Sequence, residues 1–155
     1  MVKTVQLMKK RYLVLSDGTV FEGYAFGAEK TAIGELVFNT NVVGYIETLT
    51  DPTYYGQIVL QTFPMIGNYG IIESDFIGEC KLSGYVVREW CKAPSNFRCE
   101  YDIDKFLKDK DVPGIYGVDT RELTYILREK GTMNAIICDA VPENLDEVKN
   151  FKIVG

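Results

Sequence analysis

Apolar and polar residues alternate in several short stretches of the first ninety residues, a pattern typical of β-strands. The apolar-rich stretch 11–15 and the alternating stretch 20–24 flank Ser16-Asp17-Gly18-Thr19, whose Asp-Gly pair indicates a hairpin turn. A short helix is predicted over 44–49, before Asp51-Pro52, because the residue preceding a proline disfavours the helical conformation. Further strands are predicted at 35–38, 58–62 and 82–87.

Helical spacing replaces this alternation in the second half of the chain. Within 102–110, Ile103, Phe106 and Leu107 are three and four residues apart, so they share one face of a short helix. That face is apolar, so we expect it to pack against a sheet.

The strongest helical pattern covers 120–130, with Asp119 or Thr120 as its N-cap and Gly131 at its end. A returning strand at 134–138 and a last short helix at 142–149 follow. Because strands come first and helices last, the chain is expected to fold as a layered α/β or α+β domain.

The composition fits one globular domain. The chain has 155 residues, of which 46% are hydrophobic and 25% are charged. The net charge is −5 and no basic run is present, which argues against a nucleic-acid partner. No apolar run approaches the roughly 20 residues that span a bilayer, so we expect a cytoplasmic protein with no membrane partner.

Histidine is absent from the sequence. This excludes Ser-His and Cys-His nucleophile pairs, and it removes the usual ligands of catalytic zinc. The four cysteines, Cys80, Cys91, Cys99 and Cys138, form no Cys-x-x-Cys pair. We expect reduced, mostly buried thiols and neither a metal site nor a cofactor in this domain.

Four short segments could carry a site, and each also has a structural explanation. Asp51-Pro52-Thr53-Tyr54 could present the Thr53 hydroxyl to a polar ligand, or could be a proline turn held by Asp51. Gly67-Asn68-Tyr69-Gly70 could approach a phosphate, but it lacks the lysine of a P-loop and is interpreted as a turn. Asp119-Thr120-Arg121-Glu122 pairs a carboxylate with a guanidinium, which helix capping also explains. Glu47 and Asp51 could form a carboxylate pair or be separately solvated.

Tyrosine gathers around the same region, at Tyr45, Tyr54, Tyr55 and Tyr69. The large ring and polar hydroxyl of tyrosine suit a protein–protein interface, in which the ring packs against protein and the hydroxyl lies at the solvent-exposed rim. Packing at the end of a sheet explains the cluster equally well.

The order of the motifs is more informative than any one of them. They are Gly34-Glu35-Leu36-Val37-Phe38-Asn39-Thr40, Gly44-Tyr45, Glu47, Thr50-Asp51-Pro52, Gln57-Ile58-Val59, Pro64, Ile66-Gly67-Asn68-Tyr69-Gly70, Pro94-Ser95-Asn96-Phe97-Arg98, Gly117-Val118-Asp119-Thr120-Arg121-Glu122-Leu123-Thr124 and Leu127-Arg128-Glu129-Lys130-Gly131. This succession, over residues 12–139, resembles the N-terminal domain of the small, glutamine-dependent chain of carbamoyl-phosphate synthetase.

The resemblance implies a swivelling α/β fold of three layers, β/β/α, over residues 1–150. Residues 151–155 would begin the linker to a glutamine amidotransferase domain that is absent from this sequence. It also implies a domain with no catalytic residue of its own and no cofactor. Its role would be to support the glutaminase domain and to dock the small chain on the large chain, in an enzyme that makes carbamoyl phosphate from glutamine, bicarbonate and ATP.

One residue is expected to contact a substrate in the intact enzyme. The family's Asp-Pro-Ser-Tyr motif carries a serine that contacts L-glutamine, and Thr53 occupies that position here. Two further departures from the family pattern are Ile46, in place of glutamine, and Tyr125, in place of arginine. These departures keep open an alternative, a free-standing binding or assembly module that retains the fold.

Overall fold

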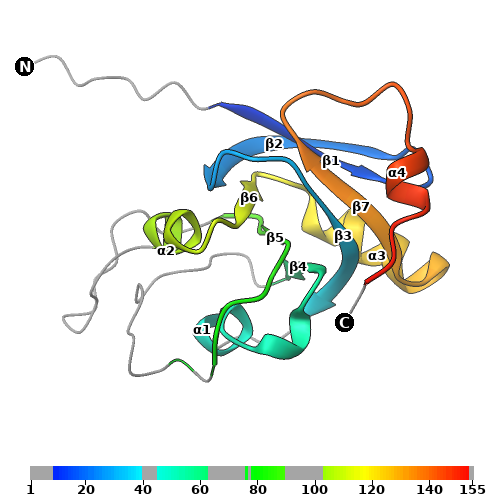
Figure 1. Cartoon of the computed structure of the whole chain (residues 1–155). Helices are drawn as coiled ribbons and strands as arrows, with labels where there is room; N and C mark the ends of the chain where they lie inside the picture. The colour runs from blue at the N-terminus through cyan, green and yellow to red at the C-terminus, as the bar shows by residue number, and fades with distance from the viewer. Residues whose placement is uncertain (1–8, 40–44, 63–75, 77, 90–102, 154–155) are drawn as a thin grey trace, which may run out of the picture.

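Seven strands form one sheet that closes into a barrel, and short helices lie around it (Figure 1). The computed structural model describes residues 9–39, 45–62, 76, 78–89 and 103–153, without the side chains of residues 45 and 46. The strands in these ranges are β1 (Lys10–Leu15), β2 (Val20–Gly27), β3 (Ala32–Asn39), β4 (Gln57–Gln61), β5 (Gly84–Val86), β6 (Pro113–Tyr116) and β7 (Met133–Cys138). The helices are α1 (Tyr45–Leu49), the single 3-10 turn η1 (Pro52–Tyr54), α2 (Ile103–Asp109), α3 (Thr120–Lys130) and α4 (Asp146–Lys149).

The strand order around the barrel is β1-β2-β6-β5-β4-β3-β7. The pairs β3-β4, β4-β5 and β5-β6 are parallel, whereas β1 pairs with β2 and β7 in antiparallel fashion. The carboxyl ends of β3, β4, β5 and β6 therefore meet at one end of the barrel. Helix α3, which follows β6, begins at this end.

The barrel interior is filled by alternate side chains of the strands. They form one buried cluster with α3, made of Leu13, Leu15, Leu36, Ile58, Leu60, Val86, Ile115, Val118, Leu123, Leu127, Ala135 and Ile137. The interior is narrow, since a Cβ atom placed on Gly84 would lie 2.5 Å from Cδ1 of Ile137. Helix α3 thus closes the end of the barrel at which it begins.

Two smaller clusters lie on the outside of the sheet. The larger joins α2 to the outer faces of β4, β5 and β2, through buried residues that include Val59, Tyr85 and Phe106. The smaller places Val148 of α4 against Val14 of β1 and Ile136 of β7. β4, β5 and the later parts of β1 and β7 are therefore buried on both faces, which explains their continuous apolar runs, whereas the first half of β2 stays partly exposed and alternates.

The hairpin, the four other predicted strands and the predicted helices are found. The α/β class is confirmed, and α3 begins and ends as its caps predict: Oδ1 of Asp119 accepts a hydrogen bond of 3.0 Å from the amide of Glu122, and Gly131 has a φ of 82°.

Strand β6 is not predicted by the sequence, because it is only four residues long and begins with Pro113-Gly114, which disfavour strands. The finer expectation of three stacked layers is not confirmed, since the strands form one closed barrel.

A buried arginine lies at the opposite end of the barrel from α3. Arg11 is 0% exposed and stands on β1 in alternation with the interior residues Leu13 and Leu15. Its Nη1 donates to three backbone carbonyls, those of Phe26 at 3.2 Å, Ala28 at 3.1 Å and Gly114 at 3.0 Å. Arg11 therefore links β1 to β2, to the segment after it and to β6 at once.

The charge of Arg11 is balanced at the surface by Asp139. Nε of Arg11 lies 3.2 Å from Oδ1 of Asp139, and Nζ of Lys9 lies 3.1 Å from Oδ2. Partial burial acts to raise the pKa of Asp139, but the hydrogen bonds from Lys9 and Arg11 outweigh it and the pKa is lowered from 3.8. The carboxylate is thus held in its charged form by the two cations.

Replacing Arg11 by methionine tests its role in barrel closure. Arg11→Met leaves three carbonyls without this donor, so we expect a loss of about 3 kcal/mol in the free energy of unfolding, at about 1 kcal/mol for each hydrogen bond. Urea denaturation measures it. Lys10→Met is the matched control on the same strand, because the Lys10–Glu22 ion pair is exposed and should matter little. Equal stability of the two variants would contradict the assigned role.

Asp139 gives a pH-dependent prediction. A carboxyl whose pKa is lowered in the folded state stabilises the fold above its ordinary pKa, and this contribution is lost as the pH falls through the lowered value. Asp139→Asn should therefore melt at a lower temperature than the wild type at neutral pH, and the difference should begin to close below pH 3.8. Melting curves at a series of pH values measure this, and a difference independent of pH would contradict it.

Candidate functional site

The turn before β4 is the place where the sequence predicts a ligand contact. Asp51 caps the 3-10 turn η1: its Oδ1 accepts hydrogen bonds from the amide of Thr53 at 2.9 Å and from the hydroxyl of Thr53 at 2.7 Å. This confirms the proline turn held by Asp51. Thr53 is exposed, and its hydroxyl oxygen keeps lone pairs that can accept a further hydrogen bond. The contact of Thr53 with glutamine stays a prediction.

A chain of polar side chains fixes this turn against the sheet. Nδ2 of Asn39 donates to the hydroxyl of Tyr54 and to Oγ1 of Thr48, each at 3.1 Å. Behind them, Nε2 of Gln61 donates to Oδ1 of Asn39 at 3.3 Å, and the Tyr85 hydroxyl donates to Oε1 of Gln61 at 3.2 Å. Because Gln61 and Tyr85 are buried, their mutual hydrogen bond satisfies groups that would otherwise be costly to bury.

The C-terminal segment passes beside the same turn. Gly56, which follows the turn, has a φ of 73°, a conformation that favours glycine. A Cβ atom on Gly56 would lie 2.9 Å from Cγ1 of Ile153, so the side chain of Ile153 rests on the glycine backbone. The chain therefore leaves the described domain next to the Asp51–Tyr55 segment.

The other sequence candidates do not assemble with this turn. Asp119 acts as the cap of α3, as its structural explanation predicts. The Asp51 carboxylate is engaged by Thr53, and no hydrogen bond joins it to Glu47 among the described residues. The Gly67–Gly70 candidate lies outside the described residues.

The tyrosine cluster is only partly described. Tyr54 packs against the cluster between α2 and the sheet, whereas Tyr55 is 51% exposed. The two expected roles, packing and surface contact, therefore fall on neighbouring residues. Tyr69 and the side chain of Tyr45 lie outside the described part of the chain.

The two described cysteines are free thiols, Cys138 buried and Cys80 partly buried. Burial raises the pKa of Cys80 and that of Cys138. Both are free, and within the described residues no group of three acidic or cysteine side chains is placed to hold a metal ion. Cys91 and Cys99 lie outside the described residues. None of the described helices is long and apolar enough to cross a membrane.

A feature that the sequence analysis missed lies where the carboxyl ends of the parallel strands meet. We call it the arginine hollow: a cavity of about 360 Å³ lined by Thr62, Arg88, Thr120, Arg121, Thr124, Tyr125 and Arg128. A second hollow of about 710 Å³ adjoins it, shares Arg88 and Arg121, and is lined also by Tyr24, Glu89, Tyr116, Gly117, Val118 and Asp119. The hollow joins residues from separate strand ends, so no single motif reveals it.

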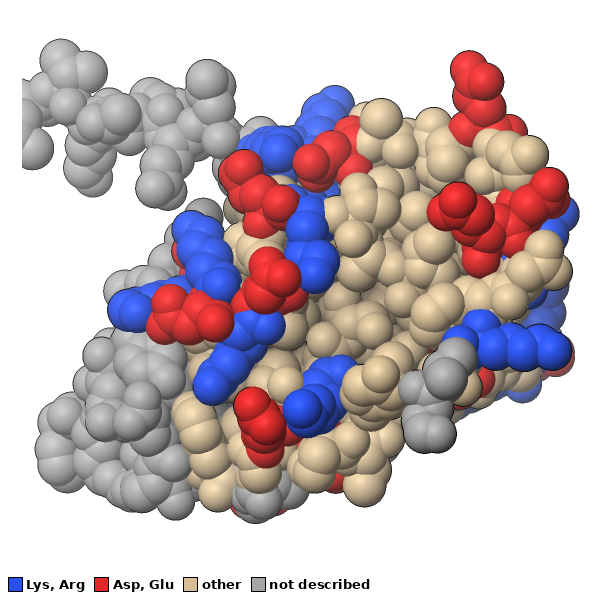
Figure 2. Space-filling model, viewed as in Figure 1, with Lys and Arg blue, Asp and Glu red and all other residues tan. Residues whose placement is uncertain are grey.

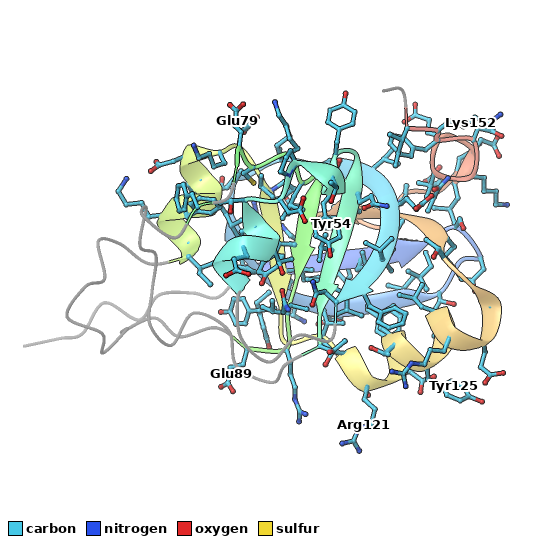
Figure 3. All side chains as sticks on the ribbon, turned by 90° about the horizontal axis from the view of Figure 1, so that it is seen from below. Tyr54, Glu79, Glu89, Arg121, Tyr125 and Lys152 are labelled. Atoms are coloured by element: carbon cyan, nitrogen blue, oxygen red, sulfur yellow. The ribbon has the colours of Figure 1, made fainter. Side chains whose placement is uncertain are left out.

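The two regions are separate but are linked through Asn39: Thr62 of the arginine hollow donates to the Asn39 carbonyl, and the Asn39 side chain donates to Tyr54. Figure 3 shows Arg121 and Tyr125 extending from α3 at one edge of the molecule and Lys152 at the opposite edge, with Tyr54 between them. Ile153, the neighbour of Lys152, packs on Gly56, so the end of the described chain and the Asp51–Tyr55 segment are together. The domain thus presents two separate candidate surfaces.

Comparisons with known proteins identify the family. The model of the carbamoyl-phosphate synthase small chain, CPSase domain, matches residues 13–137. The small chain of carbamoyl phosphate synthase from Fusobacterium nucleatum is 52% identical over 91% of this chain, and that from Archaeoglobus fulgidus is 54% identical over 83% of it. Among solved structures, an aminopeptidase from Aneurinibacillus sp. strain AM-1 covers 86% of this chain and 31% of its own, with 16% identity and a TM-score of 0.49.

The matched region is only part of each relative. It covers 39% of the Fusobacterium protein and 36% of the Archaeoglobus protein, so this chain spans about two fifths of the length of its curated relatives. The match lies in their N-terminal part. The chain belongs to the family of carbamoyl-phosphate synthase small chains and corresponds to their N-terminal CPSase domain.

Proposed function

We propose that this domain is the non-catalytic N-terminal part of a glutamine-hydrolysing carbamoyl-phosphate synthetase. In the intact enzyme, it supports the glutaminase domain that continues from its C-terminal end and docks the small chain on the large chain. The enzyme then makes carbamoyl phosphate from glutamine, bicarbonate and ATP, in the cytoplasm, for pyrimidine and arginine synthesis. The observation that carries the proposal is the 52% identity with the N-terminal part of a carbamoyl phosphate synthase small chain.

The surface beside the chain exit is the one that we assign to the glutaminase domain. The Asp51–Tyr55 segment is held rigidly by the Asp51 cap and by the hydrogen bonds of Asn39. Tyr55 is half exposed, and Ile153 lies against Gly56. A domain that continues from Ile153 would start next to this segment, so a short connection is enough to bring the two together.

Thr53 forms one edge of the glutamine site in this proposal. Its hydroxyl donates to Asp51, which fixes the direction of the oxygen lone pairs. A lone pair so fixed can accept a hydrogen bond from the α-ammonium group of glutamine. The additional methyl group of threonine, relative to the serine of the family motif, leaves this acceptor in place.

The barrel is also compatible with the three-layer description. The wall formed by β4, β5 and β6 has the barrel interior on one side and α2 on the other, each with its own buried cluster. We propose that this flattened barrel is the β/β/α arrangement of a swivelling domain, with β1, β2 and β7 as the far wall.

The first test uses the intact protein. The full-length small chain should co-purify with the large chain, and the pair should make carbamoyl phosphate with glutamine as nitrogen donor. The 155-residue domain alone should release no more ammonia from glutamine than a heat-denatured sample. Turnover by the isolated domain would contradict its non-catalytic role, and a full-length protein that does not bind the large chain would favour the free-standing module.

The second test concerns Thr53. In the full-length complex, Thr53→Val removes the hydroxyl at nearly constant shape and should raise the KM for glutamine about tenfold, the worth of one hydrogen bond. Thr53→Ser, which keeps the hydroxyl, should restore the wild-type KM. Synthesis from added ammonia should be the same in all three proteins, and an unchanged KM in Thr53→Val would remove Thr53 from the glutamine site.

A further inference from the structure

The arginine hollow concentrates positive charge in a protein whose net charge is negative. Arg88, Arg121 and Arg128 line it together with Thr62, Thr120 and Thr124, whose hydroxyls are hydrogen-bonding groups. Among the residues that the structure describes, no carboxylate forms an ion pair with any of the three arginines, and no acidic residue lines the hollow. The adjoining hollow is lined by two acids, Glu89 and Asp119, and Asp119 is engaged as the cap of α3.

The rest of the surface is arranged differently. On the face seen in Figure 2, basic side chains lie beside acidic ones. The ion pairs Lys10–Glu22, Lys30–Asp111 and Lys105–Asp109 are examples, with atom separations of 2.7–3.0 Å. The hollow is therefore a place where three arginines gather without an ion-pair partner among the described residues.

Arg121 stands where its charge is unfavourable for the fold. It is the second residue of α3, and the positive end of a helix dipole disfavours a cation in the first turn. In contrast, Arg128 and Lys130 lie in the last turn, where positive charge is favourable. A residue that lowers stability at an exposed position is expected to serve another purpose.

Aromatic side chains border the same region. Tyr125 is 60% exposed and lines the hollow, and Phe38, at the end of β3, is 36% exposed. The guanidinium of Arg128 lies 5.6 Å from the centre of the Phe38 ring, a cation–π contact that orients it. Exposed tyrosine and arginine around a hollow are typical of residues that dominate protein–protein binding.

The position of the hollow distinguishes between the two proposed neighbours. Arg121 and Tyr125 lie on the opposite side of the domain from Lys152 (Figure 3). The glutaminase domain would continue from the Lys152 side, beside Gly56, so a separate polypeptide is better placed to reach the hollow. Building on the proposed function, we infer that the arginine hollow docks a segment of the large chain that carries carboxylate side chains.

The chemistry of the hollow suits carboxylates. An arginine guanidinium binds a carboxylate through two parallel hydrogen bonds, and the bonds are charge-assisted. The hydroxyls of Thr62 and Thr124 already donate to backbone carbonyls, those of Asn39 and Thr120, so the arginine guanidinium groups are the donors to a bound carboxylate. A complementary charged interface of this kind speeds association and weakens with salt.

Charge reversal in the full-length small chain tests the inference. Arg88→Glu together with Arg121→Glu should weaken binding of the large chain on the order of 30-fold or more, as measured by calorimetric titration. Glutamate at position 121 suits the first turn of α3, so the melting temperature should not fall on that account. Lys110→Glu is the matched control, because Lys110 is exposed at the end of α2, and it should bind within about twofold of the wild type.

Three outcomes would overturn the inference. Wild-type affinity in the double variant would show that the large chain binds elsewhere, while leaving the proposed function intact. Stabilisation of the wild type by inorganic phosphate that is lost in Arg121→Glu, with unchanged affinity for the large chain, would assign the hollow to a free anion. Failure of the wild type itself to bind the large chain would remove the proposed function and the inference together.

Discussion

Closure of the sheet into a barrel is the constraint on which the rest of the structure depends. Four neighbouring strands, β3 to β6, run in the same direction, so closure brings their carboxyl ends to a single rim. Helix α3 covers that rim, and Arg11 ties β1, β2 and β6 together from inside the opposite end. Burying a guanidinium is costly; here Nη1 and Nε are hydrogen-bonded and Asp139 at the surface balances the charge, while the buried Nη2 has no hydrogen-bond partner among the described residues.

The two candidate surfaces follow from this closure. The rim at α3 collects arginines from strand ends that are far apart in sequence, namely Arg88 after β5 and Arg121 after β6. The Asp51–Tyr55 segment enters β4 and lies beside the end of the described chain. A domain built in this way can contact a covalently linked neighbour beside Ile153 and a separate partner at α3 at once, because Lys152 and Arg121 lie at opposite edges of the molecule (Figure 3).

Local signals in the sequence predicted the parts of the fold that local chemistry determines. The Asp17-Gly18 turn, the Asp119 cap and the apolar stripe of α3 each depend on a few adjacent residues, and each is found. Strand β6 was missed because its four residues have weak strand propensity and are held by their neighbours β2 and β5. The inward position of Arg11 and the arginine hollow were missed for the same reason: both depend on contacts between distant segments. The turn at Thr53 was located from sequence, but its internal hydrogen bond to Asp51 required the structure.

Hydrogen–deuterium exchange on the intact small chain, with and without the large chain, tests the central claim of two separate surfaces most directly. Binding of the large chain should protect backbone amides in the first half of α3 and leave the amides of residues 51–56 unchanged. Protection of residues 51–56 by the large chain, with exchange in α3 unaltered, would contradict the account.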